Sequence, residues 1–366
     1  MNKLGFGLLR LPKTEQPAPD HFDWPLLKQM TDACLAAGHT YFDTAYTYLD
    51  GWSEQAVRRL LVERHPRSAF RVADKLPIFQ CESYDDCRRI FDEQLARCGV
   101  EYFDCYLLHA MNARNYAIAE KTEQFRFLRE LKAAGLARRI GFSYHDSASL
   151  LDKILTEHPE VELVQLQINY LDWESEGVQS RRCYDVCVKH GKPVIVMEPV
   201  KGGTLANLPA EAEKILRALH PDWSSAAWAL RFASSLPQVE VVLSGMNAMA
   251  QLTDNLTDFD PLTVEELAAL EKAVAIINAK TAVPCTGCRY CETHCPQDLP
   301  IPDFFKMFNE LSRYPDDKWK IKPSYRQAAI GRGKASECIA CGACAEACPQ
   351  KLDIPNYMRG VAEALG

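Results

Sequence analysis

The run CTGCRYCETHCP at residues 285–296 is repeated with the same spacing as CIACGACAEACP at residues 338–349. Each run carries four cysteines in the order C-x2-C-x2-C-x3-C and is followed at once by proline. Three thiolates on one tight loop and a fourth from elsewhere can ligate an iron–sulfur cluster. Structural zinc more often uses two separated C-x2-C pairs, and disulfides need an oxidising compartment. The repeated spacing therefore favours clusters over both alternatives.

This spacing resembles that of two-cluster bacterial-type ferredoxins, in which the fourth cysteine of each run ligates the cluster of the other run. The resemblance implies two [4Fe-4S] clusters and a crossed assignment of ligands. One cluster is expected on Cys285, Cys288, Cys291 and Cys348, and the other on Cys338, Cys341, Cys344 and Cys295.

The chain has 366 residues, which is more than one hydrophobic core usually organises, so a large domain and a small one are expected. The net charge is −7 and no basic block is sustained, which argues against nucleic acid as a partner. The N-terminal residues lack a signal-peptide pattern, and no apolar stretch reaches the length of a transmembrane helix. We therefore expect a cytoplasmic protein without a membrane partner.

Upstream of the cysteines, eight short β-rich runs alternate with segments of helical periodicity. This alternation predicts an α/β fold, a (β/α)8 TIM barrel, with a small, mainly α-helical ferredoxin-like domain after it. A doubly wound sheet is the alternative, but no G-x-G-x-x-G follows the first run. The predicted strands are 4–11, 41–45, 70–76, 103–109, 139–144, 163–170, 193–200 and 239–246. The expected parts are the barrel (1–260), a connecting helix (261–283) and the ferredoxin-type domain (284–366).

Chemistry in such a barrel takes place at the carboxyl ends of the strands, and polar residues gather there in this sequence. A tyrosine, a lysine, a histidine and an aspartate at one barrel mouth can handle protons together. The polar residues at or just beyond the predicted strand ends are Asp43, Tyr48, Lys75, His109, Ser143, Gln167, Asn169, Glu198 and Ser244.

Four short motifs resemble the aldo/keto reductase family, and the cysteine-rich tail resembles its iron–sulfur branch. The motifs are FDTAYTY (42–48), DKL (74–76), DCYLLH (104–109) and IGFS (140–143). The resemblance implies an oxidoreductase that acts on a small-molecule carbonyl or alcohol. It also implies a catalytic tetrad, with Tyr48 as general acid or base, made of Asp43, Tyr48, Lys75 and His109.

The proton chemistry of these residue types agrees with the implied tetrad. A free tyrosine has a pKa of about 10, and a lysine ammonium beside its oxygen would lower that pKa. We expect Asp43 to pair with Lys75, and His109 to donate a hydrogen bond to the same carbonyl oxygen.

The family resemblance also implies NAD(P)H as the hydride carrier. It places Ser143 and Gln167 at the nicotinamide amide, and the other end of the dinucleotide at Ser244, Gly245, Gln251 and Asn255. Two departures weaken the case for tight NADP binding and leave NAD, or FMN instead, open. Met197 stands where an aromatic residue normally stacks, and Gln251 stands where an arginine often pairs with the NADP phosphate. Gly202 and Gly203 either let the backbone approach a phosphate or form a plain turn.

We expect the barrel and the clusters to act in one redox enzyme, with electrons exchanged through both clusters. The alternatives are flavin-mediated or direct single-electron reduction without NAD(P), and a non-catalytic electron-transfer or sensor protein. The basic segment Arg313–Lys334 is interpreted as a solvated connection. A docking patch for a ferredoxin- or flavodoxin-like carrier, centred on Lys318, Lys320 and Lys322, is the alternative.

Overall fold

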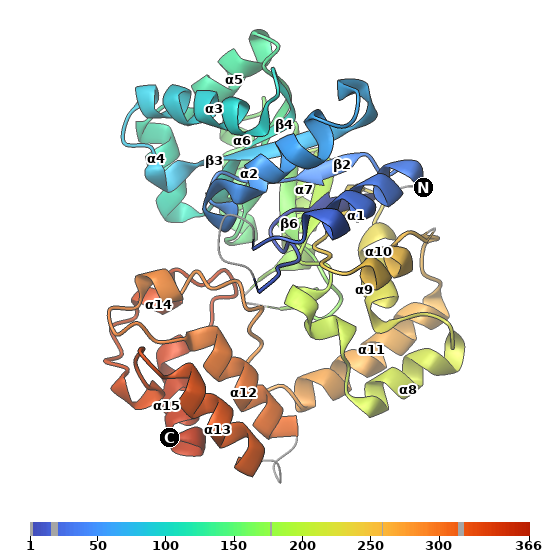
Figure 1. Ribbon diagram of the computed structural model, residues 1–366, viewed down its shortest axis with the longest axis vertical. Helices are drawn as coiled ribbons and strands as arrows, with labels where there is room; N and C mark the ends of the chain where they lie inside the picture. The colour runs from blue at the N-terminus through green and yellow to red at the C-terminus, as the bar shows by residue number, and fades with distance from the viewer. Residues whose placement is uncertain (1–2, 16–20, 176–177, 258, 314–317) are drawn as a thin grey trace. The chain divides into compact units, whose positions relative to one another are not determined.

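A computed structural model describes residues 3–15, 21–175, 178–257, 259–313 and 318–366. Within these residues, eight parallel strands close into one barrel in sequence order, with β8 pairing back onto β1 (Figure 1). The predicted (β/α)8 barrel is confirmed, and each predicted run overlaps one strand. The strands are β1 Leu4–Gly7, β2 Tyr41–Asp43, β3 Arg71–Pro77, β4 Phe103–Met111, β5 Ala137–Tyr144, β6 Leu163–Gln167, β7 Val194–Met197 and β8 Val239–Ser244.

Helices connect the strands and pack on them from outside, as α3 does on β3 and α5 on β5. Among the described residues, no helix has both the length and the apolarity to cross a membrane. The helices before residue 260 are α1 Trp24–Ala36, α2 Trp52–Val57, α3 Tyr84–Cys98, α4 Ala113–Lys121, α5 Gln124–Ala133, α6 Ala148–Glu157, α7 Ser180–Lys189, α8 Ala210–Leu219, α9 Ser225–Ser234 and α10 Met249–Asn255.

The interior of the barrel is lined by alternate strand residues, because successive side chains of a strand point to opposite faces. One apolar layer contains Tyr41, Ala73, Cys105, Leu107, Leu163, Ile195, Val241 and Leu243, all of them buried. Two residues further along their strands stand Asp43, Lys75 and Gln165, which are buried as well. The polar layer therefore follows the apolar one toward the carboxyl ends of the strands.

The chain forms two compact units. The first contains the barrel and comprises Met1–Glu174, Gln179–Pro199 and Ala227–Leu262. The second comprises Ser175–Val178, Val200–Ala226 and Thr263–Gly366, and it contains both cysteine runs. Residues 200–226 thus group with the C-terminal part of the chain, although the alternation of runs in the sequence assigned them to the barrel domain.

The second unit is mainly helical and has its own core, which includes Phe304, Phe305 and Met358. Its helix α8 packs on the long helix α11. Its remaining helices, coloured orange to red in Figure 1, follow the first cysteine run. The helices from residue 264 onward are α11 Val264–Ala279, α12 Ile301–Arg313, α13 Lys318–Ala328, α14 Ala343–Glu346 and α15 Ile354–Leu365.

The expected solvated connection at Arg313–Lys334 is exposed over much of its described length, but it contains a helix with a buried face. Helix α13 occupies its middle, and Ile321 and Tyr325 of this helix are buried in the core of the second unit. These two apolar residues are four positions apart and therefore share one face of a helix. Of the expected docking patch, residues 314–317 and the side chains of Arg313 and Lys320 lie outside the described residues.

Candidate active site and cysteine clusters

A buried ion pair lies at the carboxyl ends of β2 and β3. The Lys75 ammonium donates a hydrogen bond to Asp43 Oδ1 at 2.5 Å and another to the Thr44 carbonyl at 2.7 Å. Both charged side chains are at most 4% exposed. The phenol oxygen of Tyr48 is 3.4 Å from the same Lys75 nitrogen. The structure therefore brings three of the four expected tetrad residues together around one ammonium group.

Tyr48 does not have the lowered pKa that was expected from the sequence. Desolvation raises the pKa of Tyr48 well above its ordinary value, and nearby carboxylates raise it further, in the order Asp43, Glu198 and Asp74. Lys75 is closer to Asp43 than to Tyr48, so the carboxylate offsets the charge that would stabilise a phenolate. Tyr48 is therefore a protonated phenol at neutral pH.

His109, the fourth expected member, faces Tyr48 edge to face, with ring centroids 5.7 Å apart and an interplanar angle of 79°. Burial lowers the pKa of His109 well below its ordinary value, and charge repulsion from Lys75 and His145 lowers it further. A neutral imidazole keeps one N–H donor. Within the described residues, His109 Nδ1 is buried without a hydrogen-bond partner. The ring is therefore neutral and holds unused hydrogen-bonding capacity.

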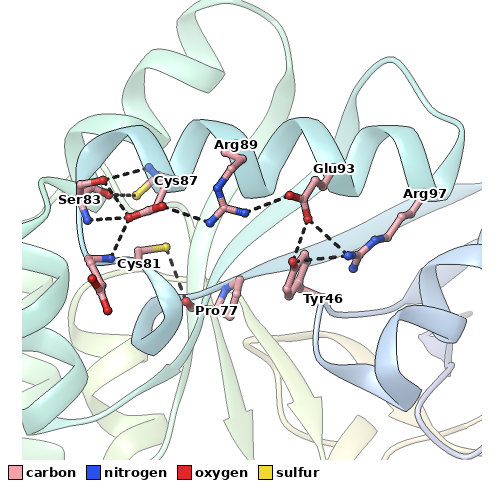
Figure 2. A network of polar contacts seen from close by, with 10 residues as sticks. Tyr46, Pro77, Cys81, Ser83, Cys87, Arg89, Glu93 and Arg97 are labelled. Atoms are coloured by element: carbon pink, nitrogen blue, oxygen red, sulfur yellow. Dashed lines mark hydrogen bonds and ion pairs between the residues drawn. The ribbon is translucent and has the colours of Figure 1, made fainter.

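The loop that carries Tyr48 is fastened to helix α3 through Tyr46. Figure 2 shows the Tyr46 side chain reaching Glu93 and Arg97 of that helix. The Tyr46 hydroxyl donates to Glu93 Oε2 at 2.8 Å, and the Arg97 guanidinium lies 4.4 Å from the centroid of the Tyr46 ring. Arg97 also donates to the fully buried Glu54 at 3.0 Å. Because Tyr46 is two residues before Tyr48, these contacts restrict the position of the phenol.

The expected nicotinamide residues end neighbouring strands. Ser143 pairs in register with Gln165 across β5 and β6, and Gln167 pairs with Met197 across β6 and β7. The Ser143 hydroxyl oxygen accepts a hydrogen bond from the Ala110 N–H at 2.8 Å. Ser143 is buried, whereas Met197 is half-buried at its strand end.

The residues expected at the other end of a dinucleotide follow β8. Asn255 donates to the Ser244 hydroxyl at 2.9 Å, and both side chains are buried. Gln251 is exposed, and its side-chain oxygen accepts from the Asn247 N–H at 2.8 Å. Gly245 follows Ser244 directly. The structure thus brings Ser244 and Asn255 together and leaves Gln251 on the surface of helix α10.

Gly202 and Gly203 belong to the second compact unit, in the short 3₁₀ segment Lys201–Ala206 that follows β7 in the chain. The φ angle of Gly202 is +65°, and a Cβ there would lie 2.0 Å from the carbonyl oxygen of Thr286. The backbone of Gly202 therefore packs directly on the first cysteine run. This contact explains why glycine is required at residue 202.

The four cysteines of the first expected set surround one space of about 300 Å³, which is also lined by Thr286, Arg289 and Gln350. Burial raises the pKa of the Cys291 thiol, and the other three cysteines of the set raise it further. The set consists of Cys285, Cys288, Cys291 and Cys348.

The second expected set surrounds a similar space of about 320 Å³ with a more apolar lining. Burial raises the pKa of the Cys344 thiol to about 11, and its three companions contribute to this shift. This set consists of Cys295, Cys338, Cys341 and Cys344. In the part of the chain that the structure describes, no three His, Cys, Asp or Glu side chains form a group that could hold a metal ion. Each set of cysteines lines a wider space, as a cube-shaped cluster requires.

The sequence model of the Aldo/keto reductase family matches residues 3–275, which is most of the chain. The chain belongs to the aldo/keto reductase family. A second model, described as a 4Fe-4S dicluster domain, matches residues 284–352 and covers both cysteine runs. This aldo/keto reductase is thus an oxidoreductase with a 4Fe-4S dicluster domain at its C-terminal end.

Among the similar proteins is an aldo-keto reductase of Mycobacterium avium, 26% identical over 242 residues that cover 65% of this chain and 78% of the relative. Similar folds occur in an aldo-keto reductase of Bacillus halodurans in its holo form (24% identity, TM-score 0.60) and in one of Klebsiella pneumoniae in complex with NADPH (20% identity, TM-score 0.59). Each of the two structures aligns with 74% of this chain, covering 91% and 90% of its own length.

One residue of the site in this aldo/keto reductase was not expected from the sequence. Gln165 donates to Asp43 Oδ2 at 3.0 Å, so Asp43 is held by Lys75 on one oxygen and by Gln165 on the other. Gln167, which was expected at the site, donates instead to Asp172 at 3.4 Å. The two-residue alternation of a strand was the available signal, because Gln165 and Gln167 share one face of β6.

Proposed function

We propose that the protein interconverts a carbonyl and an alcohol with Tyr48 as general acid or base, and that its two cysteine sets ligate [4Fe-4S] clusters which exchange electrons with that reaction. The observation that carries the proposal is the position of the protonated Tyr48 phenol, 3.4 Å from the buried, charge-paired Lys75. A protonated phenol can donate a proton to a carbonyl oxygen that is being reduced.

The roles of the other residues follow from their contacts. Asp43 and the Thr44 carbonyl hold the Lys75 ammonium in place, and this ammonium stabilises the phenolate that forms when Tyr48 gives up its proton. The neutral His109 ring is available to donate a hydrogen bond to the substrate oxygen. In the reverse direction, the Tyr48 phenolate takes the proton of an alcohol.

We propose NAD(P)H as the hydride donor, which when bound supplies both electrons of the reduction at once. One similar structure from Klebsiella pneumoniae is a complex with NADPH, and a second one is a complex with NADP and acetate. Ser143, Gln167, Ser244 and Asn255 are the residues that would hold the dinucleotide. Gln251 carries no charge to offer the NADP 2′-phosphate, so the residues present fit NADH as well as NADPH. FMN, held at the same barrel mouth, is the alternative.

The cysteine geometry supports the cluster assignment. Two sets of four cysteines surround spaces of about 300 and 320 Å³, and each set draws one member from the other run. Each [4Fe-4S] cluster would carry one electron when bound, so two clusters together would supply the two electrons of a carbonyl reduction when NAD(P)H does not. We propose a ferredoxin- or flavodoxin-like protein as the external carrier.

The test is Tyr48→Phe in protein purified without oxygen. We expect benzaldehyde reduction to fall by about 10²–10⁴-fold, the usual contribution of a general acid, with either NADPH or reduced methyl viologen as the electron source. The iron and sulfide content should not change, because Tyr48 and the cysteines belong to separate compact units.

Tyr46→Phe is the matched control, since it removes a hydroxyl from the same loop and should leave most of the activity. Full activity of Tyr48→Phe would contradict the proposed acid. Wild-type protein that contains zinc in place of iron would contradict the clusters. Release of a yellow chromophore by acid would identify flavin, and not NAD(P)H, as the cofactor of the barrel.

A further inference from the structure

Two acidic side chains are fully buried next to the strand that carries Lys75. Asp74 precedes Lys75 in β3, Glu54 lies in helix α2, and both are 0% exposed. Because successive side chains of a strand point to opposite faces, Asp74 points away from the barrel interior that Lys75 enters. A hydrogen bond joins the carboxyl groups of Glu54 and Asp74. Two ionised carboxylates are both acceptors, so this bond requires a proton between them.

The contacts of the carboxyl oxygens indicate where this proton lies. Glu54 Oε2 accepts a hydrogen bond from the Arg97 guanidinium at 3.0 Å, which favours an ionised Glu54. With both acids ionised, Glu54 Oε1 would be buried without a donor among the described residues. Asp74 Oδ1 accepts from the Lys75 backbone N–H at 2.8 Å, and Asp74 Oδ2 from the Cys98 thiol at 3.7 Å. A proton on Asp74 therefore supplies the donor that Glu54 Oε1 needs.

The electrostatics of the pair agree with this position of the proton. Desolvation raises the pKa of Asp74 well above its ordinary value, and the Glu54 charge raises it further. Desolvation also raises the pKa of Glu54, but the Arg97 guanidinium lowers it. When two buried carboxyl groups share a site, the one beside a cation ionises first. The other charged or titratable groups near the pair are Arg58, Lys75, Cys98 and Tyr106.

Asp74 also takes part in fixing the backbone of Lys75. The Lys75 N–H donates to Asp74, and the Lys75 carbonyl accepts from Gln94 Nε2 of helix α3 at 3.1 Å. Gln94 is itself buried and accepts from the Tyr106 hydroxyl at 2.5 Å. Both backbone polar groups of Lys75 are thus bonded to buried side chains. An ionised Asp74 could accept the same N–H, but its charge would raise the pKa of Tyr48.

We propose that Asp74 is a positioning residue for the carbonyl–alcohol reaction: it is protonated at neutral pH, donates a hydrogen bond to Glu54, and holds Lys75 without placing a further negative charge near Tyr48. The proposal rests on the function proposed above for Tyr48 and Lys75. Asparagine has the hydrogen-bonding pattern of a protonated aspartic acid, because its carbonyl oxygen accepts and its amide N–H donates. Leucine is similar in size and does neither.

The first measurement needs no turnover. Infrared spectra of the anaerobic full-length protein at neutral pH should contain the C=O stretching band of a protonated carboxylic acid, and this band should be missing from Asp74→Asn. Glu63→Gln is the matched control for the loss of a carboxyl group, because Glu63 is exposed, and it should keep the band. A band of the same size in the wild type and in Asp74→Asn would overturn the proposal.

The second measurement is benzaldehyde reduction with either of the electron sources named above. Asp74→Asn should keep most of the wild-type kcat, because it preserves both the contact with Lys75 and the absence of charge. Asp74→Leu removes both hydrogen bonds of the acid, and the displaced Lys75 should lower kcat by about 10–10²-fold. Equal losses in the two variants would overturn the proposal. If Asp74→Leu does not fold, the kcat of Asp74→Asn and its infrared spectrum decide the question.

Glu54→Gln tests which of the two acids carries the proton. This variant removes the carboxylate that pairs with Arg97, so its midpoint of thermal unfolding should fall below that of Asp74→Asn. The reverse order would place the proton on Glu54 and overturn the proposal. Full activity of Tyr48→Phe would refute the proposed function instead, and the infrared band would still decide whether Asp74 is protonated.

Discussion

Two lysines are buried among the described residues, one in each compact unit, and they differ in what they contact. Lys75 in the barrel donates to a carboxylate, Asp43, at 2.5 Å. Lys201 in the cysteine-containing unit donates to a neutral amide, Gln350, at 3.1 Å. Both are at most 1% exposed.

The comparison shows that burial alone does not decide what a positive charge does. The Lys75 charge is offset by Asp43, and the pKa of the adjacent Tyr48 is accordingly raised by desolvation. Asp43 thus holds the Lys75 ammonium in place, and this ammonium stabilises the Tyr48 phenolate once the proton has left. Lys201 contacts a neutral amide, Gln350, which also lines the space of the first cysteine set.

Breaking the barrel pair should have the largest effect on stability. Lys75→Met leaves the Asp43 carboxylate buried without its cation, and we expect a loss of about 3–5 kcal/mol in the free energy of unfolding. The measurement is urea unfolding followed by far-ultraviolet circular dichroism. Lys75→Met combined with Asp43→Asn should recover part of the loss, because no charge is then left unpaired.

Lys201→Gln is the counterpart in the other unit and should cost about 1 kcal/mol, because the new glutamine still offers Gln350 a hydrogen-bond donor. Equal losses in Lys75→Met and Lys201→Gln would contradict the contrast between the two lysines.

The contact that holds Lys201 in place can be tested at its neighbouring glycines. Gly202→Ala and Gly203→Ala both place a Cβ at positive φ, +65° and +98°. Only the Cβ at residue 202 meets a backbone atom, the Thr286 oxygen at 2.0 Å, whereas nothing lies within 4 Å at residue 203. We expect Gly202→Ala to be less stable than Gly203→Ala by about 1–3 kcal/mol, the usual cost of overpacking.

Thermal unfolding and iron content measure this difference. Gly203→Ala is the control for backbone strain alone. If the two variants have the same stability, the close packing of residue 202 on the first cysteine run is wrong.

A small effect is expected at the outer network of Figure 2, where the charges are partly exposed. Tyr46→Phe removes the hydrogen bond to Glu93, and we expect a loss of about 0.5–1.5 kcal/mol. Tyr84→Phe is the control, because Tyr84 lies on helix α3 with Glu93. Its hydrogen bond to Glu130 is exposed and should contribute less to stability. A larger loss in the Tyr84 variant would show that exposure does not set the contribution of these bonds.

Much of the barrel could be predicted from the sequence because its signals are local. Each strand is a short apolar run between turns, and strand ends converge at one mouth in a closed parallel barrel, so Asp43, Tyr48, Lys75 and His109 could be grouped from their positions in sequence alone. The cysteines could be grouped because their spacing repeats.

The remaining features depend on contacts between distant parts of the chain. Gln165 contacts Asp43 across the barrel interior. The strand register that brings these two residues together cannot be predicted from the sequence of either segment alone. The pKa of Tyr48 depends on which neighbour Lys75 is closer to, a difference of less than 1 Å that no spacing reveals. The packing of Gly202 on Thr286 joins segments that are more than eighty residues apart.

The exchange of one cysteine between the two runs has a consequence for biosynthesis. Three cysteines of the first set are synthesised more than fifty residues before the fourth, Cys348. Cluster assembly on that set could therefore be completed only after residue 348 has been synthesised. A nonsense codon before residue 348 would remove one thiolate from the first cysteine set and would also truncate the second cysteine run.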